Sequence, residues 1–327
     1  MIRGEEDSLA MRKLLLAVIA AAFALPAFAQ EYPARPVRIV VGFAPGGGVD
    51  ISARLMASKL AEYLGQQFVV ENKPGAGTNI AAAEVVKATP DGYTLFMNSP
   101  AVVINTALYA KPPYQLADFT GVSIFSATTN MLVVPAAVPA KTVQDLVRIA
   151  KEKPGSLNYS SAGQGTTQHL AAELFKLRTG TRIVHIPYKG SGPSMTALLA
   201  NEVQLSFINP VAAGGHVKSG KLRALAVTDD KRTEVMPEVP TMKEAGVEGV
   251  EVSLWYGLLA PAATPKEVVE KLGAAVGRAT RDPTILAQLK KQGADPVGNT
   301  PAQFNAYLKE EFARWSEVVR VSGARVE

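Results

Sequence analysis

The feature of this sequence that most constrains its fold is a repeated unit in which an apolar run leads through a glycine-rich turn into an amphipathic helix. Residues 37–43 (VRIVVGF) are almost wholly apolar and rich in β-branched side chains, and a helical pattern follows at 50–64. An apolar run of this kind is typical of a strand that is covered on both faces. The repetition therefore predicts an α/β protein built from βαβ units and parallel sheets.

The same reading applies along most of the chain. The predicted strands are 37–43, 67–70, 93–98, 131–134, 157–160, 183–187, 204–208 and 222–227. The predicted helices are 50–64, 80–87, 143–151, 167–178, 193–200 and 211–219. Two more helices are expected after 264–267 (TPKE) and 300–303 (TPAQ), because each segment has the pattern of a capping box with proline at N1.

The length of the chain predicts two domains. Without a signal peptide at 1–29, 298 residues remain (30–327), which is long for one core, and the alternation of strands and helices restarts near residue 130. We expect one lobe from 30–128 together with 253–327, and a second from 129–252. Strand crossovers near 125–130 and 250–256 would join the lobes and act as hinges. The two C-terminal helices are expected to pack back on the first lobe.

The N-terminal residues 1–29 have the pattern of a signal peptide. Arg12 and Lys13 precede an apolar stretch at 14–25, and Ala27-Phe28-Ala29 provides small residues around a cleavage site. The apolar stretch is shorter than the roughly 20 residues of a membrane-spanning helix. We expect cleavage near Ala29 and a periplasmic protein; a membrane anchor or a buried helix is the alternative. Met11 is a candidate start codon, because residues 1–10, with Glu5, Glu6 and Asp7, do not resemble an n-region; the choice between Met1 and Met11 stays open.

Composition excludes several classes of site. The net charge of +5 is spread without blocks of Lys or Arg, so it would attract a small anion and does not indicate nucleic-acid binding. Cysteine is absent, and the three histidines lack metal-binding spacing. No G-x-S-x-G elbow or other nucleophile–base arrangement is found. We therefore expect no catalytic residue, no metal and no cofactor, although the members of a triad can lie far apart in sequence.

Glycine-rich loops in both halves of the chain are candidate anion sites. Residues 44–50 (APGGGVD) and 160–167 (SSAGQGTT) each connect a predicted strand to a predicted helix, and 189–193 (KGSGP) has the same setting with proline expected at N1. Consecutive glycines let backbone N–H groups converge at a helix N-terminus, where an anion is favoured. Asp50 is expected to cap its helix with Arg54 as a partner, and Thr166 is the expected N-cap of the second. A single loop of this kind often serves only to join a strand to a helix; two of them in two lobes favour a ligand site.

At these loops the sequence resembles the Bug-type receptors, the substrate-binding proteins of tripartite tricarboxylate transporters. The resemblance runs from about Tyr32 to the C-terminus. Its marks are YPARPVRIVVGFAPGGGVD, VVENKPGAGTNIAAAEVVKATPDGYTL, SSAGQGTTQHLAAELF, HIPYKGSGPSMTALLANEVQ and GKLRALAVT. It implies a two-lobed, type II periplasmic binding (Venus flytrap) fold. It also implies that the loops 43–50 and 163–167 grip a ligand carboxylate through backbone amides, with ordered water near Gly75-Ala76-Gly77.

Departures from the family pattern bear on specificity. Ile208-Asn209-Pro210 replaces a polar pair common in the family, so an amino acid ligand is disfavoured. His169 is expected either at the ligand or in a capping or surface role. Asn98, Ser99, Tyr188, Asn209 and Tyr256 are expected at the far end of the cleft. The residues expected at the ligand are Phe43, Ala44, Pro45, Gly46, Gly47, Gly48, Asp50, Gly75, Ala76, Asn98, Ser99, Ser161, Ala162, Gly163, Gly165, Thr166, Thr167, His169, Tyr188 and Asn209.

The resemblance implies a non-enzymatic receptor for a small organic carboxylate, either a mono- or a dicarboxylate and either aliphatic or aromatic. Its partners would be the ligand and the membrane subunits of a tripartite transporter, with the receptor itself a monomer. Two alternatives stay open from the residues alone: a subunit that presents its ligand to a membrane signalling receptor, and a periplasmic hydrolase.

Overall fold

The computed structural model describes residues 31–326. Met1–Ala34 and Arg35–Glu327 are separate units, and the fold reported below is that of the second. The predicted signal peptide at 1–29 lies outside the described residues. No helix in the described part of the chain is long and apolar enough to cross a membrane.

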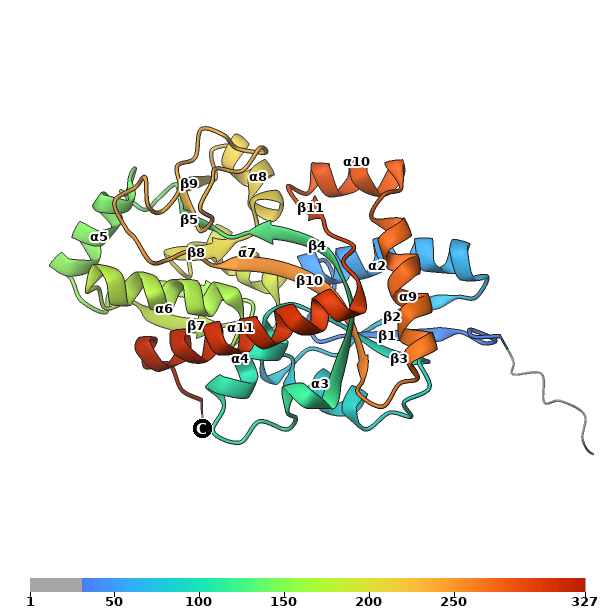
Figure 1. Ribbon diagram of the computed structural model, residues 1–327. Coiled ribbons are helices and arrows are strands. Elements are labelled where there is room, and N and C mark those ends of the chain that lie inside the picture. Colours follow the sequence, from blue (N-terminus) through green and yellow to red (C-terminus); the bar gives the residue numbers. More distant parts are fainter. Residues whose placement is uncertain (1–30, 327) are drawn as a thin grey trace, which may run out of the picture. The chain divides into compact units, whose positions relative to one another are not determined.

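Two mixed sheets organise the unit (Figure 1). The first sheet has the strand order β11-β4-β10-β3-β1-β2. Its strands β1, β2 and β3 are parallel, whereas β10, β4 and β11 are antiparallel to their neighbours. The strands are β1 (Val37–Val41), β2 (Phe68–Asn72), β3 (Thr94–Asn98), β4 (Phe119–Thr129), β10 (Ser253–Pro261) and β11 (Asp295–Pro296). The sequence predicted the parallel part of this sheet and did not predict the long antiparallel pair β4–β10.

The second sheet has the order β7-β6-β8-β5-β9. Its strands β6, β7 and β8 are parallel, and β5 runs antiparallel to both β8 and β9. The strands are β5 (Met131–Pro135), β6 (Asn158–Ser161), β7 (Val184–Pro187), β8 (Leu205–Ile208) and β9 (Leu222–Val227).

Helices connect and cover the sheets. They are α2 (Gly48–Leu64), α3 (Asn79–Val86), α4 (Ala101–Leu108), α5 (Val143–Glu152), α6 (Thr167–Thr179), α7 (Ser191–Leu199), α8 (Pro210–Lys218), α9 (Lys266–Ala279), α10 (Pro283–Lys291) and α11 (Pro301–Ser322), with short 3₁₀ turns at Ala76–Thr78 and Leu116–Asp118. The helices predicted from the sequence all correspond to one of these, and α4 and α10 were not predicted.

The chain passes from the first sheet to the second at Asn130, between β4 and β5. Beside this crossing, the Thr228 N–H donates to the Asn130 carbonyl (2.8 Å) and the Val252 N–H donates to the Thr228 carbonyl (2.8 Å). The outgoing and returning segments are therefore tied together where the sheets meet. The chain leaves the first sheet at Asn130 and returns to it between Val227 and Ser253, which is in keeping with two lobes. The lobe boundaries at 128/129 and 252/253 stay predictions.

The two long C-terminal helices pack against β4 of the first sheet. Helix α11 extends further and also packs on α6 of the second sheet, and Figure 1 shows it crossing in front of β10. The buried Glu311 carboxylate of α11 accepts hydrogen bonds from the indole N–H groups of Trp255 (3.0 Å) and Trp315 (2.9 Å). The helix is thus attached to β10. The predicted packing of the C-terminal helices on the first sheet is observed, and the additional contact of α11 with α6 was not predicted.

One of the two predicted capping boxes is confirmed. The Thr300 hydroxyl accepts from the Gln303 N–H (3.3 Å), and the Gln303 side chain accepts from the Thr300 N–H (2.9 Å). At the other, helix α9 begins at Lys266 with Pro265 as its N-cap and without a side-chain cap. The capping box at Thr264 was therefore wrong, because the helix begins one residue too late for the Thr264 hydroxyl to reach it.

Two further predictions about helix starts were wrong. Helix α2 begins at Gly48, which puts Asp50 inside the first turn, where it bonds backwards to the Gly46 N–H (2.9 Å) and does not cap. Helix α7 begins at Ser191, so Pro193 is its third residue and not its first. In both loops glycine at the N-cap lets the helix begin earlier than the polar or proline signal indicated.

Candidate functional site

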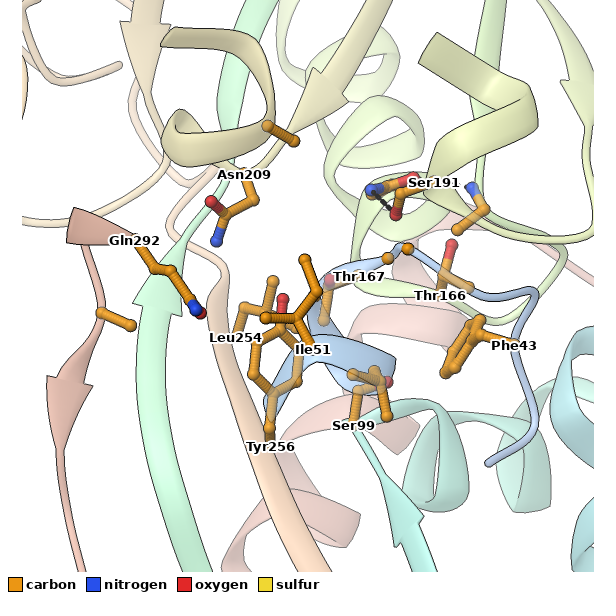
Figure 2. Close-up of a pocket in the computed structure, with 18 residues that line it drawn as sticks. Phe43, Ile51, Ser99, Thr166, Thr167, Ser191, Asn209, Leu254, Tyr256 and Gln292 are labelled. Atoms are coloured by element: carbon orange, nitrogen blue, oxygen red, sulfur yellow. Dashed lines mark hydrogen bonds between the residues drawn. The ribbon is translucent and has the colours of Figure 1, made fainter. Parts of the chain in front are cut away.

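A cavity of about 280 Å³ lies between the first glycine loop and the N-terminus of α6 (Figure 2). Its walls come from both sheets and from the C-terminal part of the chain. The lining residues are Phe43, Gly46, Gly47, Gly48, Val49, Ile51, Ser99, Ala162, Thr166, Thr167, Gln168, Ser191, Asn209, Ala212, Leu254, Tyr256, Gln292 and Ala294.

Several helices begin at this cavity. Gly48, Thr167 and Ser191 are the first residues of α2, α6 and α7, and all three line it. Asn209 precedes α8 directly, and Ser99 lies two residues before α4. The first N–H groups of a helix have no intrahelical acceptor and carry partial positive charge. The cavity therefore has a concentration of backbone donors suited to an anion.

None of the lining residues is Asp, Glu, Lys, Arg or His. Hydroxyl and carboxamide groups supply the polar side chains, and Ile51, Leu254 and the Tyr256 ring supply apolar wall, as Figure 2 shows. Burial raises the pKa of Tyr256, so its phenol stays protonated near neutral pH. The site thus offers neutral donors and apolar surface without an ionised side chain.

Asp50 holds the first loop from behind. Its carboxylate accepts from the Gly46 N–H, from Asn72 Nδ2 (2.9 Å) and from the Arg54 guanidinium (2.9 Å). Asn72 Nδ2 also donates to the Phe43 carbonyl (3.0 Å). Burial tends to raise the pKa of Asp50, but the hydrogen bonds from Arg54, Gly46 and Asn72 outweigh it, so the pKa lies below its ordinary value. Asp50 is therefore ionised, and Arg54 balances its charge. Asp50 lies outside the cavity lining and positions Gly46.

The second loop is held by its own hydroxyl groups and by Asn130, the residue between β4 and β5. The Thr166 hydroxyl accepts from the His169 N–H (3.3 Å) and donates to the Gly163 carbonyl (2.8 Å), which confirms Thr166 as the N-cap of α6. Thr167 Oγ1 accepts from the side chain of Asn130 (3.2 Å), the residue at the sheet-to-sheet crossing. The second glycine loop and the crossing between the sheets are therefore in direct contact.

His169 lies behind this loop. Its Nδ1 accepts from the Gly165 N–H (3.2 Å), and its ring stacks on His185 with centroids 4.3 Å apart. His185 stacks in turn on Tyr159 (4.6 Å) and bonds to the Ser161 hydroxyl (2.7 Å). Burial, with a smaller contribution from Lys176, lowers the pKa of His169 to about 4. Burial, followed by the effect of His169, lowers the pKa of His185 to about 3. Both rings are neutral supports of the loop.

The two lobes touch beside the cavity. The Ala44 N–H of the first loop donates to the Lys189 carbonyl of the third (3.1 Å). A second cavity of about 220 Å³ lies where the turn at Gly77 meets Gln164. In this structure, therefore, loops of both lobes are in contact beside the site.

The residues predicted at the ligand fall into three groups. Those that line the larger cavity are Phe43, Gly46, Gly47, Gly48, Ser99, Ala162, Thr166, Thr167 and Asn209. Those that line only the smaller one are Gly75, Ala76, Gly163 and Tyr188. Those that line neither are Ala44, Pro45, Asp50, Asn98, Ser161, Gly165 and His169. The expectation that Tyr256 contributes to the far end agrees with its position in the larger cavity.

Some lining residues were not expected from the sequence. They are Val49, Ile51, Gln168, Ser191, Ala212, Leu254, Gln292 and Ala294. Gln168 directly follows the recognised loop 160–167, and Ser191 lies within the recognised loop 189–193, so their positions in the first turns of α6 and α7 carried a usable signal. Leu254, Gln292 and Ala294 reach the site through the pairing of β10, β4 and β11, which no local pattern reveals.

Comparisons with known proteins agree over most of the chain. The model of the tripartite tricarboxylate transporter family receptor matches residues 52–323. Protein BugT of Bordetella pertussis is 37% identical over 321 residues, covering 96% of this chain and 98% of BugT. The structure of Rpa4515 of R. palustris with adipate is 37% identical, with a TM-score of 0.87 over 90% of this chain and 100% of that chain. MatC of Rhodopseudomonas palustris with bound malate is 32% identical, with a TM-score of 0.85 over 88% and 100%.

Proposed function

This chain belongs to the tripartite tricarboxylate transporter receptor family, and from that membership we propose that it captures a small organic carboxylate between its lobes and delivers it to a membrane transporter. The resemblance and the two-lobed fold predicted from the sequence are confirmed. The chain is a periplasmic solute-binding protein, and its family is one of receptors. The carboxylate and the delivery step are the proposal.

The observation that carries the proposal is the convergence of helix N-termini from both sheets on a cavity without ionised side chains. Gly48 of α2 and Thr167 of α6 approach it from opposite lobes. A carboxylate placed between them would accept from backbone amides of both helices and bridge the lobes. Since such bonds form only when the lobes meet, the ligand would stabilise the closed state.

The chemistry of the cavity narrows the ligand further. In the absence of an acidic lining residue, a ligand ammonium would have no partner, so amino acids are poor candidates. The volume of about 280 Å³ is at the lower end for ligand sites, which favours a small acid. Apolar contact with Ile51, Leu254 and Tyr256 suits an aliphatic or aromatic body. Adipate and malate, bound by related proteins, are small carboxylates of this kind.

Export, assembly and the absence of catalysis complete the proposal. The signal-peptide pattern at 1–29 supports export to the periplasm. The family description supports the membrane subunits of a tripartite transporter as the partner. We propose that the receptor acts as a monomer and releases its ligand unchanged.

A thermal-shift screen of the purified protein tests this function. Adipate, malate, butyrate and benzoate would be compared with their primary amides. At about 100 times its Kd a ligand adds about 2.7 kcal/mol to the free energy of unfolding, which is easily measured as a rise in Tm. We expect at least one acid to raise Tm and its amide to have little effect. If no acid in a panel extended to other small mono- and dicarboxylates raises Tm, the proposed function is wrong; chemical turnover of the bound acid would favour an enzyme.

A further inference from the structure

Ser191 is a cavity-lining residue whose hydroxyl occupies a distinctive place. It is the first residue of α7, and it faces the first glycine loop: a Cβ on Gly47 would lie 3.9 Å from the Ser191 Cβ. A ligand held between the loops would therefore lie within reach of this side chain. Figure 2 shows Ser191 directed into the site beside Thr166.

The hydrogen-bond partner of Ser191 has a fixed orientation. The Ala162 N–H donates to Oε1 of Gln168 at 2.6 Å. A backbone N–H can only donate, so the atom that it meets must be the carboxamide oxygen. The Gln168 side chain is 5% exposed, and its other end, Nε2, lies 3.2 Å from Ser191 Oγ. Because Nε2 can only donate, Ser191 Oγ accepts this bond.

The direction of the Ser191 hydroxyl follows from this chain of bonds. Its oxygen is occupied as an acceptor, and within the described residues no other hydrogen-bond partner of Ser191 Oγ is found. Its hydrogen is therefore available to a ligand in the cavity. A carboxylate oxygen or the carbonyl oxygen of an amide can accept that hydrogen, whereas an ammonium cannot. The bond to the ionised carboxylate is the stronger of the two, because its acceptor carries charge.

We propose that Ser191 donates a hydrogen bond to the ligand carboxylate, and that Gln168 is a positioning residue which fixes this polarity. The pair makes the site prefer an ionised acid to its amide. This inference rests on the proposed function and adds a residue-level basis for its selectivity.

The neighbouring hydroxyls differ in this respect. The Thr166 hydroxyl already donates to the Gly163 carbonyl, so it has no hydrogen left for a ligand. Thr167 Oγ1 accepts from Asn130, but the Asn130 Oδ1 atom has no partner among the described residues, so nothing fixes that carboxamide. Of these three hydroxyls, Ser191 is the one whose oxygen is held as an acceptor by a fixed group while its hydrogen has no partner among the described residues.

The test measures Kd by calorimetry for the acid that most raises Tm in the panel of adipate, malate, butyrate and benzoate, and for its amide. A hydrogen bond to a charged group contributes about 1.5–3 kcal/mol, so Ser191→Ala should weaken acid binding about 10- to 100-fold. The amide carbonyl can accept only a neutral hydrogen bond, worth about 0.5–1.5 kcal/mol, so the Kd of the amide should rise about 2- to 12-fold, less than that of the acid. Gln168→Met should also weaken acid binding selectively, and the double variant should resemble Ser191→Ala because the two side chains act as one unit.

Thr196→Ala is the matched control. Thr196 is exposed on the same helix, and its hydroxyl donates to the Gly192 carbonyl of that helix (3.3 Å), so removal of the hydroxyl should leave both Kd values unchanged. Acid binding by Ser191→Ala within about twofold of the parent protein, on the order of 0.4 kcal/mol, would overturn the inference. Equal losses for acid and amide would do the same, because they indicate a merely structural role. Failure of the parent protein to bind any acid would instead overturn the proposed function.

Discussion

Gly48 lies so close to Tyr256 that a Cβ on Gly48 would overlap the phenol hydroxyl. This contact brings the N-terminus of α2 against β10, the strand by which the chain returns to the first sheet, and makes both part of one cavity wall. Glycine at position 48 is therefore required by packing, because it leaves room for Tyr256. The backbone there is helical, so its conformation alone does not require glycine.

Gly48→Ala should accordingly destabilise the protein. The added methyl group must displace Tyr256 or the start of α2, and overpacking of this kind costs about 1–3 kcal/mol. Gly47→Ala is the control, since its Cβ would lie 3.8 Å or more from its neighbours; it should cost less than about 1 kcal/mol. Urea denaturation measures both. Similar losses in the two variants would show that the Tyr256 contact does not restrict position 48.

Gly77→Ala should impair ligand binding because it disturbs the contact between the two lobes. A Cβ on Gly77 would overlap the carbonyl oxygen of Gln164 in the other lobe. Gly65 has a similar left-handed backbone, with φ of 71° against 61° at Gly77, but a Cβ there would meet nothing within 4 Å. Both substitutions carry a backbone cost of about 1–2 kcal/mol.

Only the Gly77 variant should lose affinity for the carboxylate, by about tenfold or more, corresponding to about 1.4 kcal/mol. Small-angle X-ray scattering should find it less compact than the parent protein in the presence of ligand. If Gly65→Ala and Gly77→Ala bind equally well, contact at Gly77 is not needed for capture.

Glu311→Ala should be strongly destabilising. It removes the acceptor of two buried indole N–H groups, those of Trp255 and Trp315, and each unsatisfied donor costs about 1–3 kcal/mol. We expect a total loss of roughly 2–5 kcal/mol in the free energy of unfolding. Glu317→Ala on the same helix removes an exposed ion pair with Arg320 and should cost about 0–1 kcal/mol. Chemical denaturation that gives equal values would contradict the role assigned to the Glu311 carboxylate.

Acid should weaken the fold through the stacked histidines. The pKa of His169 is about 4 in the folded protein, below the ordinary value of 6.5, because the ring is buried. The unfolded chain therefore binds more protons as the pH falls below about 6.5, and the stability present at neutral pH is lost progressively down to about pH 4. His169→Gln should reduce the loss between pH 7 and pH 4.5 by roughly 2–3 kcal/mol.

His216→Gln provides the comparison, because this residue lies on α8 and is not one of the stacked rings Tyr159, His169 and His185. Urea midpoints of the three proteins at the two pH values measure the effect. A parent protein and a His169 variant with the same pH dependence would show that protonation of His169 does not limit acid stability.

The sequence predicted local features of the fold more successfully than long-range ones. Strand β1, the loop at 44–50 and the Thr166 cap follow from periodicity and from residue chemistry within a few positions. The start of α2 was misjudged, because Asp50 is a good cap by type yet bonds to Gly46 and Arg54 instead. Local patterns thus identified the segment and did not decide between competing partners.

The candidate site was predicted in part for the same reason. Its glycine loops can be identified from the sequence alone. Gln292, in contrast, lies some 240 residues from the first loop and reaches the cavity through sheet pairing. His169 was expected at the ligand or in a capping or surface role. It is a buried support of the second loop, because stacking on His185 was invisible from spacing. Long-range pairing and side-chain direction were the missing information.

The most direct test of carboxylate capture is the perturbation of backbone amide NMR signals on titration with the acid selected by thermal shift. The account predicts that the N–H signals of Gly48, Val49 and Thr167 shift together and saturate at one Kd, because amides from both lobes meet one carboxylate. Shifts confined to one lobe would contradict it. So would shifts confined to the groove lined by Lys218, Lys290 and Lys291, since binding would then rest on ionised side chains and not on the helix N-termini.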